Sequence, residues 1–306
     1  MLARLAWAER HADEVRRALM LEPRGHTDMC GAVLTEPVSP TAHAGLLFMH
    51  QSGYATMSGH GVIAVTTIVL ERGLILPGGD GTILVYDTPA GTVSAHATIE
   101  DGRVSRVRVT GVPSFVLAAG VAVTVGGRAL RADIAYGGSF YAIVDAEAAG
   151  LPIDAAHLPE LRRAGIAICE AVGKAVRVAH PADEALAGLR GTIFTGPPTD
   201  PTADLRNLVV FADGTADRSP SGTGTAAVMA VVEAMGLVDP ERPFVHEGVI
   251  GTTFSGRVAG RSTVGDLPAI VPELEGSAWI TGEHTFVADT RDPFGEGFQL
   301  GDPQRR

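Results

Sequence analysis

Cysteine is scarce in this sequence, with only Cys30 and Cys169 in 306 residues. Two thiols cannot build the disulfide framework of a small secreted protein, and they lack the paired spacing of a zinc site. Cys169 lies in the stretch LRRAGIAICEAV, which is typical of a helix, and there we expect a buried and inert thiol. The sequence therefore gives no sign of a disulfide-rich or metal-binding protein.

Long apolar runs and an excess of positive charge are also missing. No run of eighteen or more apolar residues is present, which argues against a transmembrane helix. The amino-terminal stretch MLARLAWAERHADEVRRALMLEP is interrupted by charges and does not have the pattern of a signal peptide. Lys and Arg number 24 against 35 Asp and Glu, so neither nucleic acid nor an anionic membrane is the expected partner. These absences favour a cytoplasmic protein that binds a small molecule.

Glycine and proline, by contrast, are plentiful. The 38 Gly and 19 Pro residues predict many turns and short strands, and a chain of this length can form two domains. A strand, a glycine loop, a helix and several further strands follow one another twice, which indicates an α+β protein built as two similar halves. The pattern predicts helices over 8–20, 59–72, 155–177 and 222–235, and strands over 45–50, 82–125, 132–146, 190–195, 206–212, 244–259, 268–274 and 277–289.

Two stretches that lie 163 positions apart share the pattern Ser-Gly-x-Gly-x-x-Ala-Val. They are TMSGHGVIAV from Thr56 and SPSGTGTAAV from Ser219. A serine before an apolar helix is usually only an N-cap. Two such helix starts that face each other would instead offer free N–H groups and two positive dipole ends to one small anion. A dinucleotide-binding loop fits the glycines but not the context, because a polar segment separates each loop from the strand before it.

The sequence resembles the proline racemase family over nearly its whole length. The blocks that carry the resemblance are EPRGHTDMCGAV, GYATMSGHGVIA, VPSFV, AYGGSFYAIVDA, FADGTADRSPSGTGTAA, HEGVIGTTFSGRV and ITGEHTFVADTRDPFGEGF, in this order. The family includes proline racemase, 4-hydroxyproline 2-epimerase and trans-3-hydroxy-L-proline dehydratase. The resemblance implies the diaminopimelate epimerase-like fold, in which two pseudo-symmetric α/β halves place mixed or antiparallel strands around a central helix. The active site would lie between the halves.

The resemblance also implies where the chain divides. Residues 1–126 plus about 280–306 are predicted to form the first half, because the last strand, near 280–290, is expected to cross back to it. Residues 127–279 are predicted to form the second half. The first strand of the family has no counterpart here. We therefore expect either a start codon that is placed too late or a first half that lacks one edge.

The resemblance assigns roles to the residues of the site. In the family, two cysteines exchange the α-proton of proline from opposite faces without a cofactor, and Ser58 and Ser221 occupy these positions here. Asp217, which alone would be read as a turn residue, is expected to hold the ring ammonium. No metal or cofactor is expected. The backbone N–H groups expected to hold the substrate carboxylate belong to Gly59, His60, Gly222 and Thr223.

Four further residues invite a functional interpretation. The His60 side chain could be taken for a general base, but the resemblance gives the role to its backbone. His26 and His246 are expected to be structural. Cys30 lies in the block RGHTDMCG, outside the two catalytic blocks, and we expect that it does not replace a missing catalytic thiol.

The two serines decide which reaction is expected. A thiol has a pKa of about 8.5, whereas a hydroxyl titrates far higher and is a poor base without a partner. Racemisation needs an acid–base group on both faces of Cα, while dehydration of a 3-hydroxyproline needs only one. The family's dehydratases carry a hydroxyl residue at the second position. We therefore expect a trans-3-hydroxy-L-proline dehydratase that forms pyrroline-2-carboxylate, in which Ser58 accepts the α-proton and Ser221 hydrogen-bonds to substrate or water.

Two alternatives stay open. The first is a proline racemase or 4-hydroxyproline 2-epimerase, natural or with both thiols engineered to serine, and inactive or impaired if serine cannot replace cysteine. The second is a non-catalytic binder of an imino acid. All three hypotheses share a proline or hydroxyproline as the small-molecule ligand. The sequence leaves the oligomeric state open, with a homodimer as one option.

Overall fold

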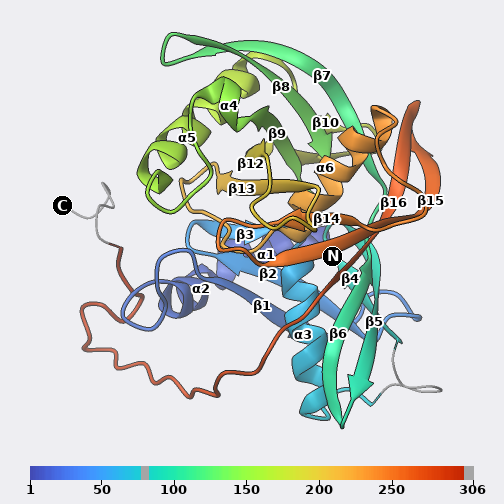
Figure 1. Cartoon of the computed structure of the whole chain (residues 1–306). Helices are drawn as coiled ribbons and strands as arrows, with labels where there is room; N and C mark the ends of the chain where they lie inside the picture. Colours follow the sequence, from blue (N-terminus) through green and yellow to red (C-terminus); the bar gives the residue numbers. More distant parts are fainter. Residues whose placement is uncertain (77–82, 300–306) are drawn as a thin grey trace.

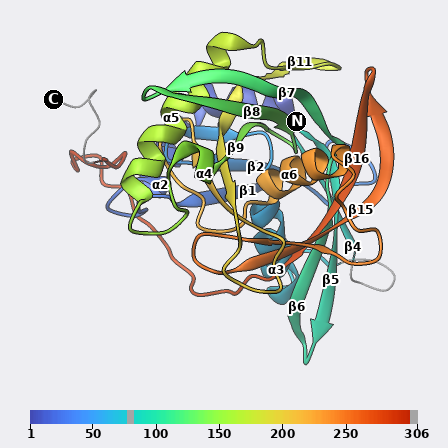
Figure 2. The same cartoon turned by 45° about the horizontal axis from the view of Figure 1, so that its top comes forward.

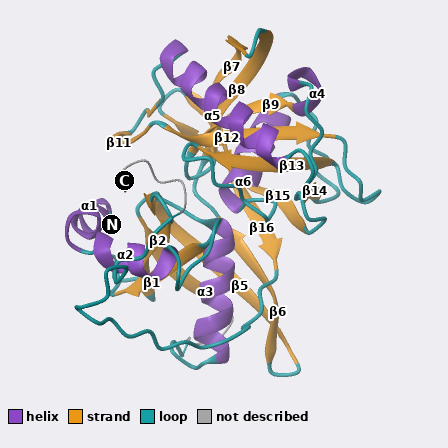
Figure 3. Cartoon of the chain, turned by 90° about the vertical axis from the view of Figure 1, so that its left-hand side faces the viewer, coloured by secondary structure: helices purple, strands orange, loops and turns teal. Residues whose placement is uncertain are grey.

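The computed structural model describes residues 1–76 and 83–299 of the chain. Fourteen strands form one long, curved sheet, and two further strands form a separate hairpin. The sheet wraps around two helices, α3 (Gly59–Glu71) and α6 (Gly222–Ala234), in two lobes (Figures 1 and 3). The protein thus has the predicted α+β fold with two halves of similar design.

The strands and helices around α3 are called the α3 half. Its strand β1 pairs antiparallel with β2, so that Cys30 lies opposite His50, and β4, β5 and β6 follow as an antiparallel meander. Every residue of β2 is buried, because this strand runs through the centre of the half. The elements are α1 (Leu2–His11), α2 (Asp13–Met20), β1 (Cys30–Thr35), β2 (Ala44–His50), β3 (Gly53–Ala55), β4 (Ile83–Thr88), β5 (Gly91–Glu100) and β6 (Arg103–Thr110).

The remaining elements form the α6 half, in which the strands close into a ring. Strand β7 pairs with its neighbour β8 and also with β16, through Phe115 opposite Ala269. The first nine residues of α6 are all buried, as expected for an apolar helix enclosed by a ring of strands. Helix α5 covers the opposite face of β9, β12 and β13 (Figure 2). The elements are β7 (Ser114–Val125), β8 (Arg128–Tyr136), β9 (Phe140–Asp145), α4 (Ala146–Ala149), α5 (Leu158–Ala175), β10 (Ala179–His180), β11 (Asp183–Ala187), β12 (Leu189–Gly196), β13 (Leu205–Phe211), β14 (Phe244–Glu247), β15 (Thr253–Val264) and β16 (Leu267–Gly276).

Strand β16 joins the two halves. Its end pairs antiparallel with β6, from Glu273 opposite Thr110 to Gly276 opposite Val107. The chain then runs along the α3 half as an irregular segment, which an ion pair between Arg72 and Glu283 (2.7 Å) holds there (Figure 1). The return to the α3 half is therefore made by β16 and the tail that follows it.

The strand predicted over 277–289 is wrong, because the structure has no strand there. The alternating pattern of this segment favours a strand, but a strand forms only where another strand edge offers it hydrogen bonds. Trp279 and Val287 are each 81% exposed, so this segment does not contribute its large side chains to the core.

Most other predicted elements are confirmed, with two corrections. The single helix predicted over 8–20 is two short helices, α1 and α2, and the hairpin of β10 and β11 was not predicted. None of the described helices is long and apolar enough to cross a membrane. The predicted division of the chain between residues 126 and 127 stays a prediction. It falls in the turn between β7 and β8, which pair with each other as an antiparallel hairpin.

Candidate active site

The starts of α3 and α6 touch each other at two glycines. A Cβ atom added to Gly59 would lie 2.6 Å from the Cα of Gly222, and one added to Gly222 would lie 2.5 Å from the Cα of Gly59. No side chain fits at such a distance, so glycine is required at both positions. The duplicated loops of the sequence are thus neighbours in space, and they meet at one place between the halves.

Each helix begins with a serine cap. The N–H of Gly61 donates to the Oγ of Ser58, and the N–H of Gly224 donates to the Oγ of Ser221, both at 3.2 Å. Because the first four N–H groups of a helix have no partner within it, these caps leave others free. Among the described residues, no hydrogen bond is made to the four N–H groups predicted to hold a carboxylate, which belong to Gly59, His60, Gly222 and Thr223.

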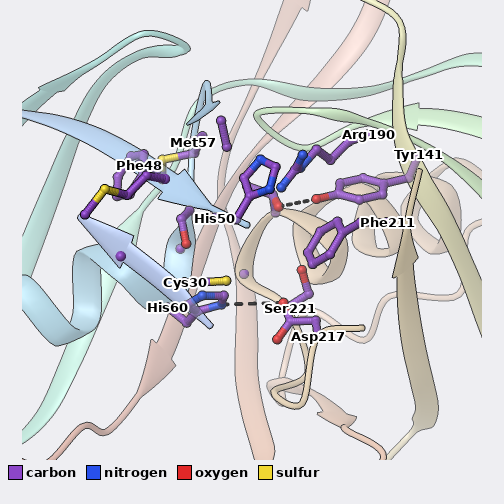
Figure 4. Close-up of a pocket in the computed structure, with 17 residues that line it drawn as sticks. Cys30, Phe48, His50, Met57, His60, Tyr141, Arg190, Phe211, Asp217 and Ser221 are labelled. Atoms are coloured by element: carbon purple, nitrogen blue, oxygen red, sulfur yellow. Dashed lines mark hydrogen bonds and ion pairs between the residues drawn. The ribbon is translucent and has the colours of Figure 1, made fainter. Parts of the chain in front are cut away.

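A small pocket opens at this junction. Its volume is about 30 Å³, room for about two water molecules at about 10–15 Å³ each. All seven predicted site residues line it: Ser58, Gly59, His60, Asp217, Ser221, Gly222 and Thr223. Residues that the sequence did not place there also line it, among them Cys30, Phe48, His50, Tyr141, Arg190 and Phe211 (Figure 4).

Two abutting helix starts make the pocket attractive to an anion. Each start carries a partial positive charge of about half an elementary charge, and two such ends repel each other when nothing lies between them. A single carboxylate or phosphate would relieve this repulsion and would accept hydrogen bonds from the free N–H groups. The small volume favours a carboxylate on a compact molecule.

An imidazole–carboxylate pair crosses from one half to the other. The Nδ1 of His60 lies 3.5 Å from the Oδ2 of Asp217, whose other oxygen accepts a hydrogen bond from the Ser219 hydroxyl at 2.8 Å. Burial lowers the pKa of His60, but the charge of Asp217 outweighs this and raises the pKa to about 10. Burial raises the pKa of Asp217, and the opposing effects of His60 and Ser219 leave it below its usual value. Both groups are therefore charged at neutral pH.

Asp217 also has unused bonding capacity. Its side chain is 6% exposed, and within the described chain its Oδ2 makes no hydrogen bond, since the His60 contact is an ion pair at longer range. A buried carboxylate oxygen without a donor is costly. Because Asp217 lines the pocket, a ligand with an N–H group could satisfy it.

A second pair of the same kind was not predicted. The Nδ1 of His50 lies 3.5 Å from the Oδ2 of Asp213, and the Ser52 hydroxyl bonds to both side chains. Here burial dominates and lowers the pKa of His50, although Asp213 opposes the effect. The charge of Arg190 lowers it further. At neutral pH the two histidines of the pocket thus carry different charges.

Ser221 rests on a buried polar scaffold. Its φ of 64° is unusual for a residue other than glycine. The carbonyl of the preceding Pro220 accepts hydrogen bonds from Asn207 (2.7 Å) and from Thr225 (3.1 Å). His246 lies 2.9 Å from the Thr225 hydroxyl, and burial lowers its pKa to about 3. His246 is thus neutral and part of the scaffold, in keeping with its predicted structural role.

Tyr141 and Cys30 are two of the pocket residues that the sequence analysis did not place there, and each lies on a strand. Tyr141 on β9 is hydrogen-bonded to the Thr223 hydroxyl at 2.7 Å. Cys30 opens β1 and lies across from His50, and its sulfur is beside the His60 imidazole (Figure 4). The expectation that Cys30 does not replace a catalytic thiol stays a prediction, but the residue lines the pocket. The pairing of the apolar strand 45–50 with the stretch before it was the signal that could have shown it.

No group of three or more His, Cys, Asp or Glu side chains in residues 1–76 and 83–299 is arranged to hold a metal ion. The charged pair of the pocket, His60 with Asp217, instead crosses from one half to the other. The site can therefore bind a small anion with a cationic N–H group, and it can move protons.

A sheet in two lobes around two helices, with a pocket where the helix starts meet, defines an α+β protein of the diaminopimelate epimerase-like type. The chain belongs to the proline racemase family, because the family model described as "Proline racemase" matches residues 1–299. It is 41% identical over 300 residues to a trans-3-hydroxy-L-proline dehydratase of Bacillus cereus, and the alignment covers 98% of this chain and 90% of that protein. It is 43% identical over 289 residues to a 4-hydroxyproline 2-epimerase of Streptosporangium roseum, covering 94% and 86%. A hydroxyproline epimerase from Agrobacterium vitis, solved with bound trans-4-hydroxy-L-proline, superimposes with a TM-score of 0.90 at 33% identity, covering 97% and 86%.

Proposed function

We propose that this protein dehydrates trans-3-hydroxy-L-proline to pyrroline-2-carboxylate, beginning with loss of the α-proton and without a cofactor. The observation that carries the proposal is the contact between two Ser-capped helix starts with four free N–H groups in one pocket. The curated relatives act on hydroxyprolines, and the Bacillus cereus protein has this dehydratase name. A compact zwitterion with a ring nitrogen suits both the anion-binding helix starts and Asp217.

The substrate contacts follow from the free groups of the pocket. The carboxylate would accept hydrogen bonds from the N–H groups of the two helix starts, and the ring ammonium would donate to Asp217 Oδ2. When the α-proton leaves, its electron pair moves into the carboxylate as an enediolate. The two helix starts are already oriented toward that charge, which is the arrangement that stabilises such an intermediate most.

The elimination then balances without another reactant. The electron pair at Cα forms a double bond to C3, the C3–O bond breaks, and the hydroxyl leaves with one proton as water. The resulting enamine rearranges to the imine, pyrroline-2-carboxylate. Ser58 lies on the α3 side of the pocket, and we propose that it accepts the α-proton from that side. Ser221 lies on the α6 side, where it would hydrogen-bond to the substrate or to water.

A racemase or epimerase of proline or 4-hydroxyproline is the second candidate. It is favoured by one feature, a hydroxyl on each of the two halves, since inversion at Cα needs a group on each face. A non-catalytic imino-acid binder would use the same contacts without proton transfer. The composition favours a cytoplasmic protein under each candidate, and a homodimer is an option that a measurement of mass in solution would test.

Proton NMR in heavy water separates the three candidates. The protein is incubated in turn with L-proline, trans-4-hydroxy-L-proline and trans-3-hydroxy-L-proline. A pyrroline formed from the 3-hydroxy compound supports the dehydratase, and α-deuteration with inversion of the other two supports the epimerase. Binding without exchange or elimination of any compound would contradict both enzymes. In that case, Ser58→Cys with Ser221→Cys would show whether two thiols restore inversion.

A further inference from the structure

The pocket contains a thiol that the proposed function does not yet use. Cys30 and Cys169 are the only cysteines of the chain. Cys169 is buried in α5, whereas Cys30 lines the pocket and is exposed. Figure 4 shows the Cys30 sulfur beside the imidazole of His60, and the Nδ1 of that imidazole lies 3.5 Å from the Oδ2 of Asp217. Cysteine, histidine and aspartate thus follow one another across the junction of the halves.

The lining of the pocket places Cys30 close to any ligand bound there. Cys30 lines the same pocket as Asp217 and the two helix starts, so a ring acid held by those groups lies next to its thiol. An independent feature indicates that a ligand belongs there, because the buried Oδ2 of Asp217 has no hydrogen-bond donor among the described residues. A ligand N–H at that oxygen would place the ring against the Cys30–His60 wall.

The chemistry also calls for a base that is available near neutral pH, which a serine hydroxyl without a partner is not. Within the described chain, the Ser58 Oγ has the Gly61 N–H as its hydrogen-bond partner and no side chain that could take its proton. A thiol is a far stronger acid than a hydroxyl, so a thiolate forms far more readily than an alkoxide. His60 is kept protonated by Asp217, and Cys30 is therefore next to a positive charge.

We propose that the Cys30 thiolate, beside the His60 imidazolium, takes the α-proton of the bound imino acid. This inference rests on the proposed function and replaces Ser58 as the proton acceptor. The Cα–H bond breaks, an S–H bond forms at Cys30, and the electron pair of Cα–H moves into the carboxylate. In the dehydration, the proton then leaves with the 3-hydroxyl as water, directly or through solvent, and this regenerates the thiolate. Ser58 keeps its place as helix cap and substrate contact.

The test measures α-hydrogen exchange of L-proline and pyrroline formation from trans-3-hydroxy-L-proline in heavy water. Cys30→Ala and Cys30→Ser should each lose at least about 100-fold in both rates, as expected for removal of a general base. Ser58→Ala should lose less than Cys30→Ala. Cys169→Ala is the matched control and should keep the wild-type rates, because its thiol is buried in α5 away from the pocket.

Two further readouts separate catalysis from folding. Iodoacetamide should label Cys30 and not Cys169 in the native protein, with protection by L-proline, and the labelled protein should be inactive. The pH–rate profile of Cys30→Ser should move to higher pH, which a merely structural role of Cys30 would not cause. Thermal unfolding of both Cys30 variants should match that of the wild type.

The outcomes are distinct. If the wild type exchanges the α-hydrogen and Cys30→Ala does so within about threefold, far below the effect of a lost base, the proposal is overturned while the proposed function stands. If Ser58→Ala loses more activity than Cys30→Ala, the proton acceptor is Ser58 and the proposal is overturned. If the wild type exchanges and eliminates nothing, the proposed function fails, and the role of Cys30 fails with it.

Discussion

The starts of α3 and α6 have the same sequence pattern and the same serine cap, yet their surroundings differ. Around α6 the strands close into a ring through the pairing of β7 with β16, whereas no described pairing connects β1 back to β16 around α3. Ser221 is 2% exposed and has a φ of 64°, while Ser58 is partly buried with an extended backbone. The α6 half therefore holds its serine more tightly than the α3 half does.

Equivalent positions in the two loops show how the duplicate diverged. Four residues after each serine stand Val62 in α3 and Thr225 in α6, and only the threonine takes part in a polar scaffold. Two residues after each serine stand His60, which pairs with Asp217 of the other half, and Thr223, which pairs with Tyr141 of its own half. Both halves thus contribute a serine-capped helix start to the pocket. The α3 half supplies the basic side chains of the pocket pairs and the α6 half supplies their carboxylates.

The largest effect is expected where the two helix starts touch. Gly222→Ala would place a Cβ 2.5 Å from Gly59, so the helices must separate. We expect a loss of about 2–3 kcal/mol in the free energy of unfolding, in the range of overpacked cores, and complete loss of α-hydrogen exchange. Urea unfolding and proton NMR measure the two effects. Gly59→Ala should behave in the same way.

Gly173→Ala is the matched control for this change. Gly173 lies in α5, and a Cβ there meets no atom within 4 Å. Alanine is the better helix former by up to about 1 kcal/mol, so this variant should be slightly more stable and fully active. A Gly222→Ala protein as active and as stable as Gly173→Ala would show that the two helix starts are not in contact.

The second largest effect concerns the pair that crosses between the halves. Asp217→Asn removes the charge that keeps His60 protonated and that would hold the ring ammonium. We expect a loss of at least about 100-fold in kcat/KM, comparable to removal of one oriented charge-stabilising group. An NMR titration should also show that the pKa of His60 falls, because burial then acts unopposed.

Asp154→Asn is a control with the same chemistry at a remote place. Asp154 pairs with His157 at 2.8 Å, but both side chains are exposed and lie outside the pocket. Its activity should equal that of the wild type. Equal activity losses in the two variants would mean that Asp217 acts through general stability and not at the site.

Local sequence signals predicted the two central helices almost to the residue. The helix predicted over 59–72 is Gly59–Glu71, and the one predicted over 222–235 is Gly222–Ala234. Serine marks each start. The glycine after each end, Gly73 or Gly236, has a positive φ of 62° or 72°, which explains why the ends were also found.

Long-range pairing could not be predicted in the same way. Cys30 and His50 of the α3 half and Tyr141 of the α6 half meet in the pocket only because the two halves pack together, and nothing in their own sequence neighbourhood indicates that contact. The segment 277–289 shows the converse, since its strand pattern is clear but its surroundings offer no partner. The resemblance to the family predicted which backbone N–H groups line the pocket, whereas the packing of the two halves was needed to place the Cys30 thiol among them.

A smaller loss of stability and activity is expected when the polar scaffold below Ser221, which Ser58 lacks, is weakened. Thr225→Val keeps the shape of the side chain but removes the hydroxyl that supports Pro220 and contacts the buried His246. Leaving the buried His246 without this hydroxyl partner costs about 1–2 kcal/mol, and the position of Ser221 should become less well defined. We expect that loss in urea unfolding, together with reduced activity.

Thr67→Val in α3 is the corresponding control. The Thr67 hydroxyl donates only to the carbonyl of Ile63 in its own helix, so its loss leaves no buried donor or acceptor without a partner. Stability and activity should change little. Should Thr67→Val be as harmful as Thr225→Val, the scaffold under Ser221 would not be what distinguishes the α6 half.

The smallest expected effect is on the pH dependence of the free energy of unfolding, which should differ between the two imidazole–carboxylate pairs. His60 has a raised pKa of about 10, so the stability that it contributes is complete below its unfolded pKa of about 6.5 and is lost as the pH rises through about 10. His50 has a lowered pKa, so its contribution is present above about pH 6.5 and is lost as the pH falls. Two pairs with the same 3.5 Å geometry should therefore have opposite pH slopes.

Urea unfolding of the wild type, His60→Gln and His50→Gln over a range of pH tests this contrast. Between about pH 7 and pH 10.5, the advantage of the wild type over His60→Gln should shrink by more than about 1.4 kcal/mol, the equivalent of one pKa unit. Below about pH 6.5, the advantage over His50→Gln should shrink instead. The difference arises because the charge of Asp217 outweighs the burial of His60, while at His50 burial outweighs the charge of Asp213. Slopes of the same sign would mean that the two pairs are electrostatically equivalent, and that the His60 imidazole has no special role beside Cys30.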